Sequence, residues 1–164
     1  MLRITLFVIS VVLTSCKSVK NIEKQPDCPE GYECYGEVLK DQSISILKDG
    51  IGKTYIKINQ DESHNVIKYI YKYSGEPNIA DDSYIETFYF QIPQKSNKIS
   101  LSGKELKNVK ALVQKSCFCP DAGYALIEQG HLDIKKQKDH YYIKFKYTPD
   151  RNMSVSTIET QVEF

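Results

Sequence analysis

The sequence predicts an all-β domain, a single antiparallel β-barrel or sandwich of about nine strands with one short helical turn and stabilising disulfides. Residue types that favour strands are frequent, and the chain contains 12 Tyr but no Trp. Apolar residues alternate with polar ones in short segments, and turn-forming residues separate these segments. Long helical segments do not alternate with the strands, so a parallel sheet is not expected.

Alternation with a period of two residues places the strands along the chain. Ile44 and Ile46 share one face of the first expected strand, and the sequence YYIKFKY at residues 141–147 alternates most cleanly. The expected strands are residues 43–47, 55–58, 66–73, 84–92, 109–119, 124–134, 141–147 and 158–164.

Two segments depart from simple alternation. An S-x-x-E capping box begins at Ser102 and predicts a helical turn at residues 103–108. The residues that follow fit helical and strand spacing equally well, and we expect a strand that runs to Cys119. Gly130 interrupts the expected strand 124–134, which indicates a β-bulge there.

The N-terminus reads MLRITLFVISVVLTSC. Arg3 precedes an apolar run at residues 6–13 that is far shorter than the roughly 20 residues needed to cross a membrane. This pattern is typical of a secretory signal peptide. The run ends in LTSC, which resembles the lipobox of bacterial lipoproteins. The expected division is a signal peptide at residues 1–15, a lipidated cysteine with a flexible tether at 16–27, and a β-rich domain at 28–164.

The resemblance implies that the thiol of Cys16 receives a diacylglycerol and that its amine is acylated after cleavage. More than one acyl chain gives stable anchoring, so the implied partner is a membrane. Lys17 follows, where an Asp tends to hold such lipoproteins at the inner membrane, and this implies the cell envelope at the outer membrane. The alternative is ordinary secretion, with Cys16 as a further disulfide cysteine. From Cys117 to Ile134 the chain is also similar to uncharacterised small lipoproteins of Gram-negative envelopes, which carry no assigned activity.

Four cysteines remain for the domain: Cys28, Cys34, Cys117 and Cys119. An even number in an exported domain indicates disulfides. We expect Cys117 and Cys119 to lie side by side on a strand, which favours two bridges from this strand to the segment of Cys28 and Cys34. A zinc site is the alternative, but structural zinc sites space their cysteines more regularly. A redox C-x-C pair would need a helix N-terminus that the sequence does not supply.

Composition and motifs exclude several functions. The formal net charge is +1, so no basic field would attract nucleic acid. The sequence contains no nucleophile elbow, zinc-protease motif or phosphate loop. His131 and Asp133 with His140 could form a metal or acid–base site, but a solvated hairpin explains them as well. The acidic pairs Asp61-Glu62 and Asp81-Asp82 fit solvated turns. We therefore expect no enzyme, no metal and no cofactor.

The function predicted from these observations is a non-enzymatic binding or assembly module in the envelope. Tyr69, Tyr71 and Tyr73 share one face of strand 66–73, which is either a contact surface or part of the core. One alternative is an inhibitor of an exported hydrolase. Tyr32-Glu33-Cys34 resembles the Y-x-C opening of one family of lysozyme-inhibiting lipoproteins, although the S-G-x-x-Y loop of that family is not matched. A small-ligand carrier is the other alternative, if the interior is hollow.

Overall fold

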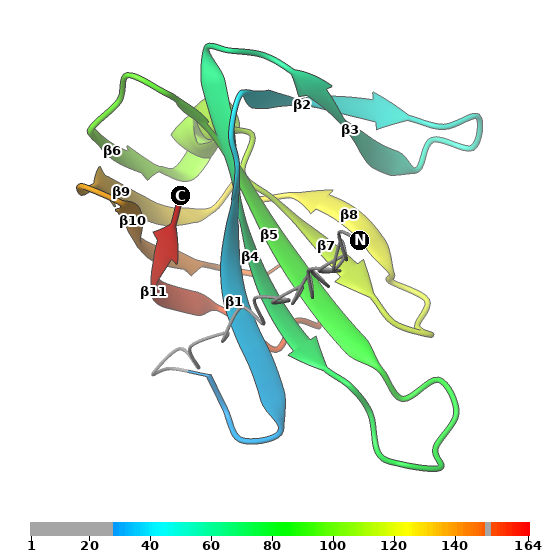
Figure 1. Cartoon of the computed structure of the whole chain (residues 1–164). Coiled ribbons are helices and arrows are strands. Elements are labelled where there is room, and N and C mark those ends of the chain that lie inside the picture. Colours follow the sequence, from blue (N-terminus) through cyan, green and yellow to red (C-terminus); the bar gives the residue numbers. More distant parts are fainter. Residues whose placement is uncertain (1–27, 150–151) are drawn as a thin grey trace, which may run out of the picture.

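The computed structural model describes residues 28–149 and 152–164, which form two packed β-sheets and a separate two-stranded ribbon (Figure 1). The expected signal peptide, Cys16 and the tether lie outside the described residues. Every pairing between strands is antiparallel, as predicted.

The larger sheet has five strands in the order β1-β4-β5-β7-β8. Its long central strands β4 and β5 pair over their full length, and they carry apolar residues on both faces. Both faces are therefore covered, one by the second sheet and one by the ribbon. The strands of this sheet are β1 (Tyr32–Leu39), β4 (His64–Tyr73), β5 (Tyr84–Pro93), β7 (Leu112–Ser116) and β8 (Gly123–Leu126).

The smaller sheet has four strands in the order β11-β10-β9-β6. Along β10 every second residue from Tyr141 to Tyr147 is buried, so one face packs on the larger sheet and the other faces solvent. Its strands are β6 (Lys98–Ser102), β9 (Gly130–Lys136), β10 (His140–Tyr147) and β11 (Thr157–Glu163).

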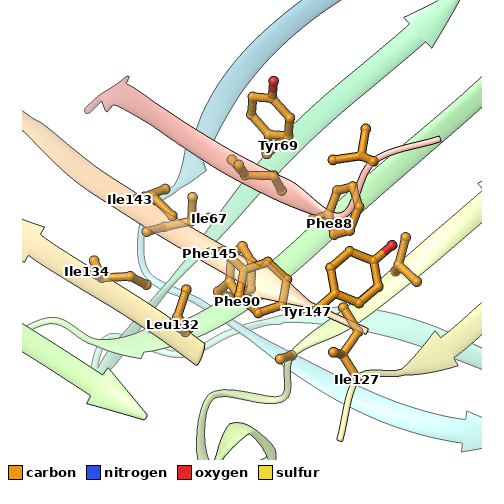
Figure 2. Close-up of a cluster of buried hydrophobic side chains, with 14 of the residues drawn as sticks. Ile67, Tyr69, Phe88, Phe90, Ile127, Leu132, Ile134, Ile143, Phe145 and Tyr147 are labelled. Carbon is orange, nitrogen blue, oxygen red and sulfur yellow. The ribbon is translucent and has the colours of Figure 1, made fainter. Parts of the chain in front are cut away.

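Aromatic and aliphatic side chains fill the space between the two sheets (Figure 2). Phe88 and Phe90 of the larger sheet meet Phe145 of the smaller sheet edge to face, with ring centroids 6.4 and 5.1 Å apart. All three rings are fully buried. Burial of this kind supplies the main driving force for folding, at about 25 cal/mol per Å² of apolar surface.

The ribbon of β2 (Gln42–Lys48) and β3 (Thr54–Gln60) covers the outer face of the larger sheet. Ile44 is fully buried there, against Val66, Tyr89 and Leu112. The side chain of Gln91 accepts a hydrogen bond from the backbone N–H of Ile44 at 2.7 Å, which fixes the ribbon to the sheet.

At one side of the sandwich β1 packs directly against β11. A Cβ at Gly36 would lie 2.2 Å from a methyl carbon of Val162, so the approach of the two strands requires glycine. The sheets remain separate within the described part of the chain. The fold is thus a sandwich rather than a closed barrel.

The structure confirms the all-β class and the short helical turn, which is the 3₁₀ helix η1 (Gly103–Val109). The structure contains β1 and β6, which the pattern did not reveal. The prediction of one strand at 124–134 is wrong, because β8 and β9 belong to different sheets. Gly130, at φ +156°, begins β9 after the chain crosses between them, and it is not a bulge.

The cysteines form two local disulfides, Cys28–Cys34 and Cys117–Cys119, with Cα atoms 5.6 and 5.3 Å apart. The predicted cross-links between the two segments are therefore wrong. The expectation assumed that Cys117 and Cys119 lie on a strand, where residues two apart are about 6.6 Å apart. However, β7 ends at Ser116 and the chain bends, which brings the two residues closer together.

Replacing Gly130 with alanine tests the crossing between the sheets. A Cβ there would lie 2.6 Å from the backbone oxygen of Lys146 and 2.9 Å from the Cα of Tyr147. We expect Gly130→Ala to lower the free energy of unfolding by about 1–3 kcal/mol in urea titrations. Gly50→Ala is the matched control, because a Cβ at Gly50 meets nothing within 4 Å. Equal effects at the two positions would contradict the close approach at Gly130.

Candidate binding surface

An open groove of about 550 Å³ separates the tip of the β2–β3 ribbon from the loop between β7 and β8. The ribbon contributes Gly52, Lys53 and Thr54 to its lining. The β7–β8 loop and the start of β8 contribute Pro120, Asp121, Ala122, Gly123 and Tyr124.

Large apolar side chains are exposed beside both walls of this groove. Phe118 is 86% exposed and lies two residues before Pro120, while Ile51 is 80% exposed and directly precedes Gly52. Leu47 and Tyr55 form a cross-strand pair on the ribbon, and both are exposed. Single exposed apolar residues are common, but a group beside a groove is typical of an interaction site. We call the groove, together with Ile51 and Phe118, which neighbour its lining residues in the sequence, the candidate surface.

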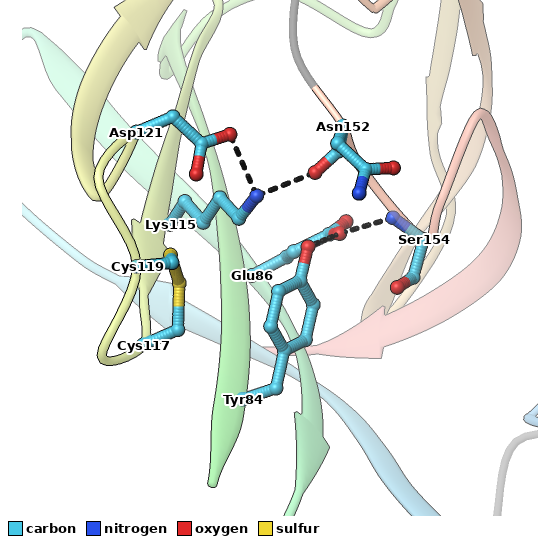
Figure 3. The surroundings of a disulfide bond; sticks show 8 residues. All are labelled: Tyr84, Glu86, Lys115, Cys117, Cys119, Asp121, Asn152 and Ser154. Atoms are coloured by element: carbon cyan, nitrogen blue, oxygen red, sulfur yellow. Dashed lines mark hydrogen bonds and ion pairs between the residues drawn. A yellow bond between two sulfur atoms is a disulfide. The ribbon is translucent and has the colours of Figure 1, made fainter. Parts of the chain in front are cut away.

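The β7–β8 loop that presents Phe118 is held from its two ends. The Cys117–Cys119 disulfide encloses Phe118. Lys115, which is 5% exposed, donates a hydrogen bond from Nζ to Oδ2 of Asp121 at 2.7 Å. The same Nζ donates to the backbone oxygen of Asn152 at 2.6 Å (Figure 3). Lys115 therefore joins the groove wall to the connection between β10 and β11.

Glu86 stands directly opposite Lys115 in the β5–β7 register and is fully buried. Its carboxylate accepts hydrogen bonds from the backbone N–H of Ser154 and from the hydroxyl of Tyr84 (Figure 3). It also accepts a hydrogen bond from the backbone N–H of Val155. A buried carboxylate is costly unless it is satisfied in this way. Glu86 and Lys115 together form a polar clamp that holds residues 152–155 against the larger sheet.

The electrostatics of the polar clamp follow from its burial. Desolvation raises the pKa of Glu86, although the Tyr84 hydroxyl, the two backbone N–H groups and the charge of Lys115 act in the opposite direction. Burial, together with the hydrogen bond to Glu86, also raises the pKa of Tyr84. Tyr84 therefore stays protonated and donates to the carboxylate.

The tyrosines proposed as a contact surface lie elsewhere. Tyr69 and Tyr71 are 5% and 6% exposed and belong to the core between the sheets, so the contact interpretation is wrong for them. Tyr73 is half-buried, and its ring centroid lies 5.2 Å from that of Tyr32. The alternation along β4 identified a shared face correctly. Because β4 is covered on both faces, alternation could not show whether the face with the tyrosines is exposed or buried.

The three histidines do not form one site. Asp133 Oδ2 lies 2.9 Å from His131 Nε2, and Ser102 Oγ lies 2.7 Å from His131 Nδ1. His140 instead contacts Asp139, and it lies six residues along β10 from the partner of His131, about 20 Å away. The sequence suggested the His131–Asp133 pair, but Ser102 joins it through strand pairing that the sequence did not reveal.

The acidic pairs lie in turns. Asp61 accepts hydrogen bonds from the hydroxyl and backbone N–H of Ser63, which with a contact to His64 lower its pKa. Asp82 accepts a hydrogen bond from the backbone N–H of Glu76 at 3.0 Å within the loop between β4 and β5. These contacts fix local turns and do not bring the two acidic pairs together.

Glu86 and Lys115 did not stand out in the sequence as candidate site residues. Glu86 alternates with Phe88 and Phe90 on β5, and Lys115 alternates with Val113 on β7. The signal that could have identified them is a charged residue at a position where the alternation predicts a buried apolar one. Such a residue can also lie where the strand leaves the core, so the pattern alone does not reveal that Glu86 and Lys115 are buried.

One group of potential metal ligands occurs among the described residues: Cys117, Cys119 and Asp121, with one donor atom of each within 4.8 Å of the others. These residues do not suit an ion as they stand, because the sulfurs are bonded to each other and Asp121 is paired with Lys115. Within the described part of the chain, helices capable of crossing a membrane are absent. No protein-family model, curated protein or solved structure matches the chain.

Replacing Glu86 with glutamine tests the electrostatics of the polar clamp. Because the folded pKa of Glu86 is raised, its contribution to stability is complete below the unfolded value of 4.5 and is lost as pH rises through the folded value. Relative to the wild type, Glu86→Gln should therefore gain stability as pH rises above 4.5. Urea unfolding at a series of pH values above 4.5 measures the difference. A relative loss with rising pH would contradict the raised pKa.

Proposed function

We propose that this chain is a lipoprotein of the cell envelope, anchored through Cys16, whose β-domain is a non-enzymatic binding or assembly module. The observation that carries the proposal is the candidate surface, where Ile51 and Phe118 are exposed beside an open groove. Exposing two large apolar side chains to water costs free energy, and this cost is removed when a partner covers them. The partner this surface suits is another envelope protein.

The filled interior supports a surface-binding role over a carrier role. Small-ligand carriers enclose an apolar cavity of several hundred Å³. Here Phe88, Phe90 and Phe145 occupy the space between the sheets and contact one another. Tyr141 is also fully buried and packs on Phe164 at a centroid distance of 4.7 Å. A ligand would have to displace this core, whereas a partner could bind the candidate surface without disturbing it.

The position of the domain relative to the proposed anchor also supports the role. The described domain begins at Cys28, so the eleven residues 17–27 separate it from Cys16. An extended tether of that length reaches at most roughly 40 Å. The domain would therefore remain close to the bilayer and could meet other proteins of the same membrane at high local concentration.

Metabolic labelling with palmitate tests the anchor. The wild-type chain should incorporate palmitate and fractionate with membranes, because more than one acyl chain makes release slow. Cys16→Ser should lose both the label and the membrane association. Cys117→Ser is the matched control and should retain both, because it removes a different cysteine. Palmitate on the Cys16→Ser chain would contradict the proposal.

Photocross-linking in intact cells tests the candidate surface. A photoreactive phenylalanine analogue at position 118 or 51 should give the same discrete adduct, because each position lies within two residues of one wall of the same groove. The control position is Lys95, which is exposed in the turn between β5 and β6. Adducts that are equally frequent at Lys95, or different at positions 51 and 118, would contradict a single binding surface.

A further inference from the structure

Three polar side chains form a continuous chain of hydrogen bonds on the outer face of the smaller sheet. Ser102 Oγ lies 2.7 Å from His131 Nδ1, and His131 Nε2 lies 2.9 Å from Asp133 Oδ2. Strand pairing produces the geometry, because Ser102 stands directly opposite His131 in the β6–β9 register. Asp133 is two residues further along β9 and so shares the face of His131.

The direction of each hydrogen bond follows from the groups present. Hydrogen bonds from the side chains of Ser100 and His131 lower the pKa of Asp133, so its carboxylate is ionised at neutral pH and can only accept. His131 Nε2 must therefore carry a proton. In the neutral imidazole the lone pair is then on Nδ1, where it accepts a hydrogen bond from the hydroxyl of Ser102. This is the arrangement of a serine whose proton a base can remove.

The three side chains are open to a reactant from solvent. The side chain of His131 is 53% exposed and that of Asp133 is 30% exposed. Ser102 is itself exposed, so its hydroxyl is accessible from solvent. Lys146 stands opposite His131 in the β9–β10 register, and a cation beside the site favours developing negative charge.

We propose that Ser102 is a nucleophile that accepts an acyl group from a carboxylic ester, with His131 as its general base and Asp133 orienting the imidazole. In this step Ser102 Oγ bonds to the carbonyl carbon while its proton passes to Nδ1 of His131. The bond between that carbon and the alcohol oxygen then breaks, and the alcohol leaves with the proton from His131. The product is an acylated Ser102, a covalent modification that is separate from the candidate surface.

The chain offers a matched control in the turn before β4. Ser63, His64 and Asp61 are also in contact, but there the hydroxyl of Ser63 donates directly to Asp61 Oδ1. Nδ1 of His64 faces both Asp61 and Ser63, so its lone pair is not reserved for the serine. Ser63 is exposed like Ser102, but it lacks a dedicated base.

Reaction of the purified full-length chain with a fluorophosphonate tests the proposal. Ser102 Oγ would bond to phosphorus, fluoride would leave, and the proton would pass to His131. Peptide mass spectrometry should place the adduct on Ser102, formed about 100-fold faster than on Ser63, since general-base catalysis contributes at least this much. Ser102→Ala should abolish that adduct, and Ser63→Ala should leave its rate unchanged.

The role of His131 is tested separately. His131→Ala should slow the labelling of Ser102 about 100-fold, and free imidazole should restore much of the rate by replacing the missing base. His131→Gln, which retains a polar side chain, should show the same loss with an unchanged unfolding midpoint. Labelling of Ser102 no faster than that of Ser63, or a rate that is insensitive to either substitution, would overturn the proposal.

Discussion

The buried carboxylate of Glu86 is the interaction on which one end of the sandwich depends. It accepts hydrogen bonds from the backbone of Ser154 and Val155, which lie on the connection between the last two strands. Val155 is buried, so its N–H would otherwise have to find another partner away from water. Glu86 therefore satisfies the backbone of the second sheet from a strand of the first. The aromatic core holds the sheets together along their length, and the polar clamp defines how they meet at this end.

The same polar clamp leads outward to the candidate surface. Lys115 contacts the backbone oxygen of Asn152 on one side and Asp121 on the other, so the groove wall and the inter-sheet connection share one cation. The disulfide around Phe118 constrains the rest of that loop. A surface that is rigid before binding loses less conformational entropy when a partner covers it. The fold can therefore present an exposed aromatic residue on a short, constrained loop.

The sequence predicted the parts of the fold that depend on local alternation, and it failed where distant segments decide the outcome. The clean alternation from Tyr141 to Tyr147 located β10 within one residue. β1 was missed because a glycine, Gly36, interrupts the apolar pattern on its inner face. Glycine is needed there because Val162 of a distant strand packs against that position. The Cys117–Cys119 bridge depends on a bend after β7 that alternation does not encode. Of the candidate surface, the sequence indicated only that turn-forming residues separate the neighbouring strands.

Amide hydrogen exchange at Ser154 and Val155 tests the central claim most directly, because these are the N–H groups that Glu86 is said to hold. Both amides should exchange as slowly as the amide of Phe88 in the central strand β5, since opening them requires separation of the sheets at this end. Exchange of Ser154 and Val155 at the rate of unprotected loop amides would contradict this claim, because it would show that the carboxylate does not hold them.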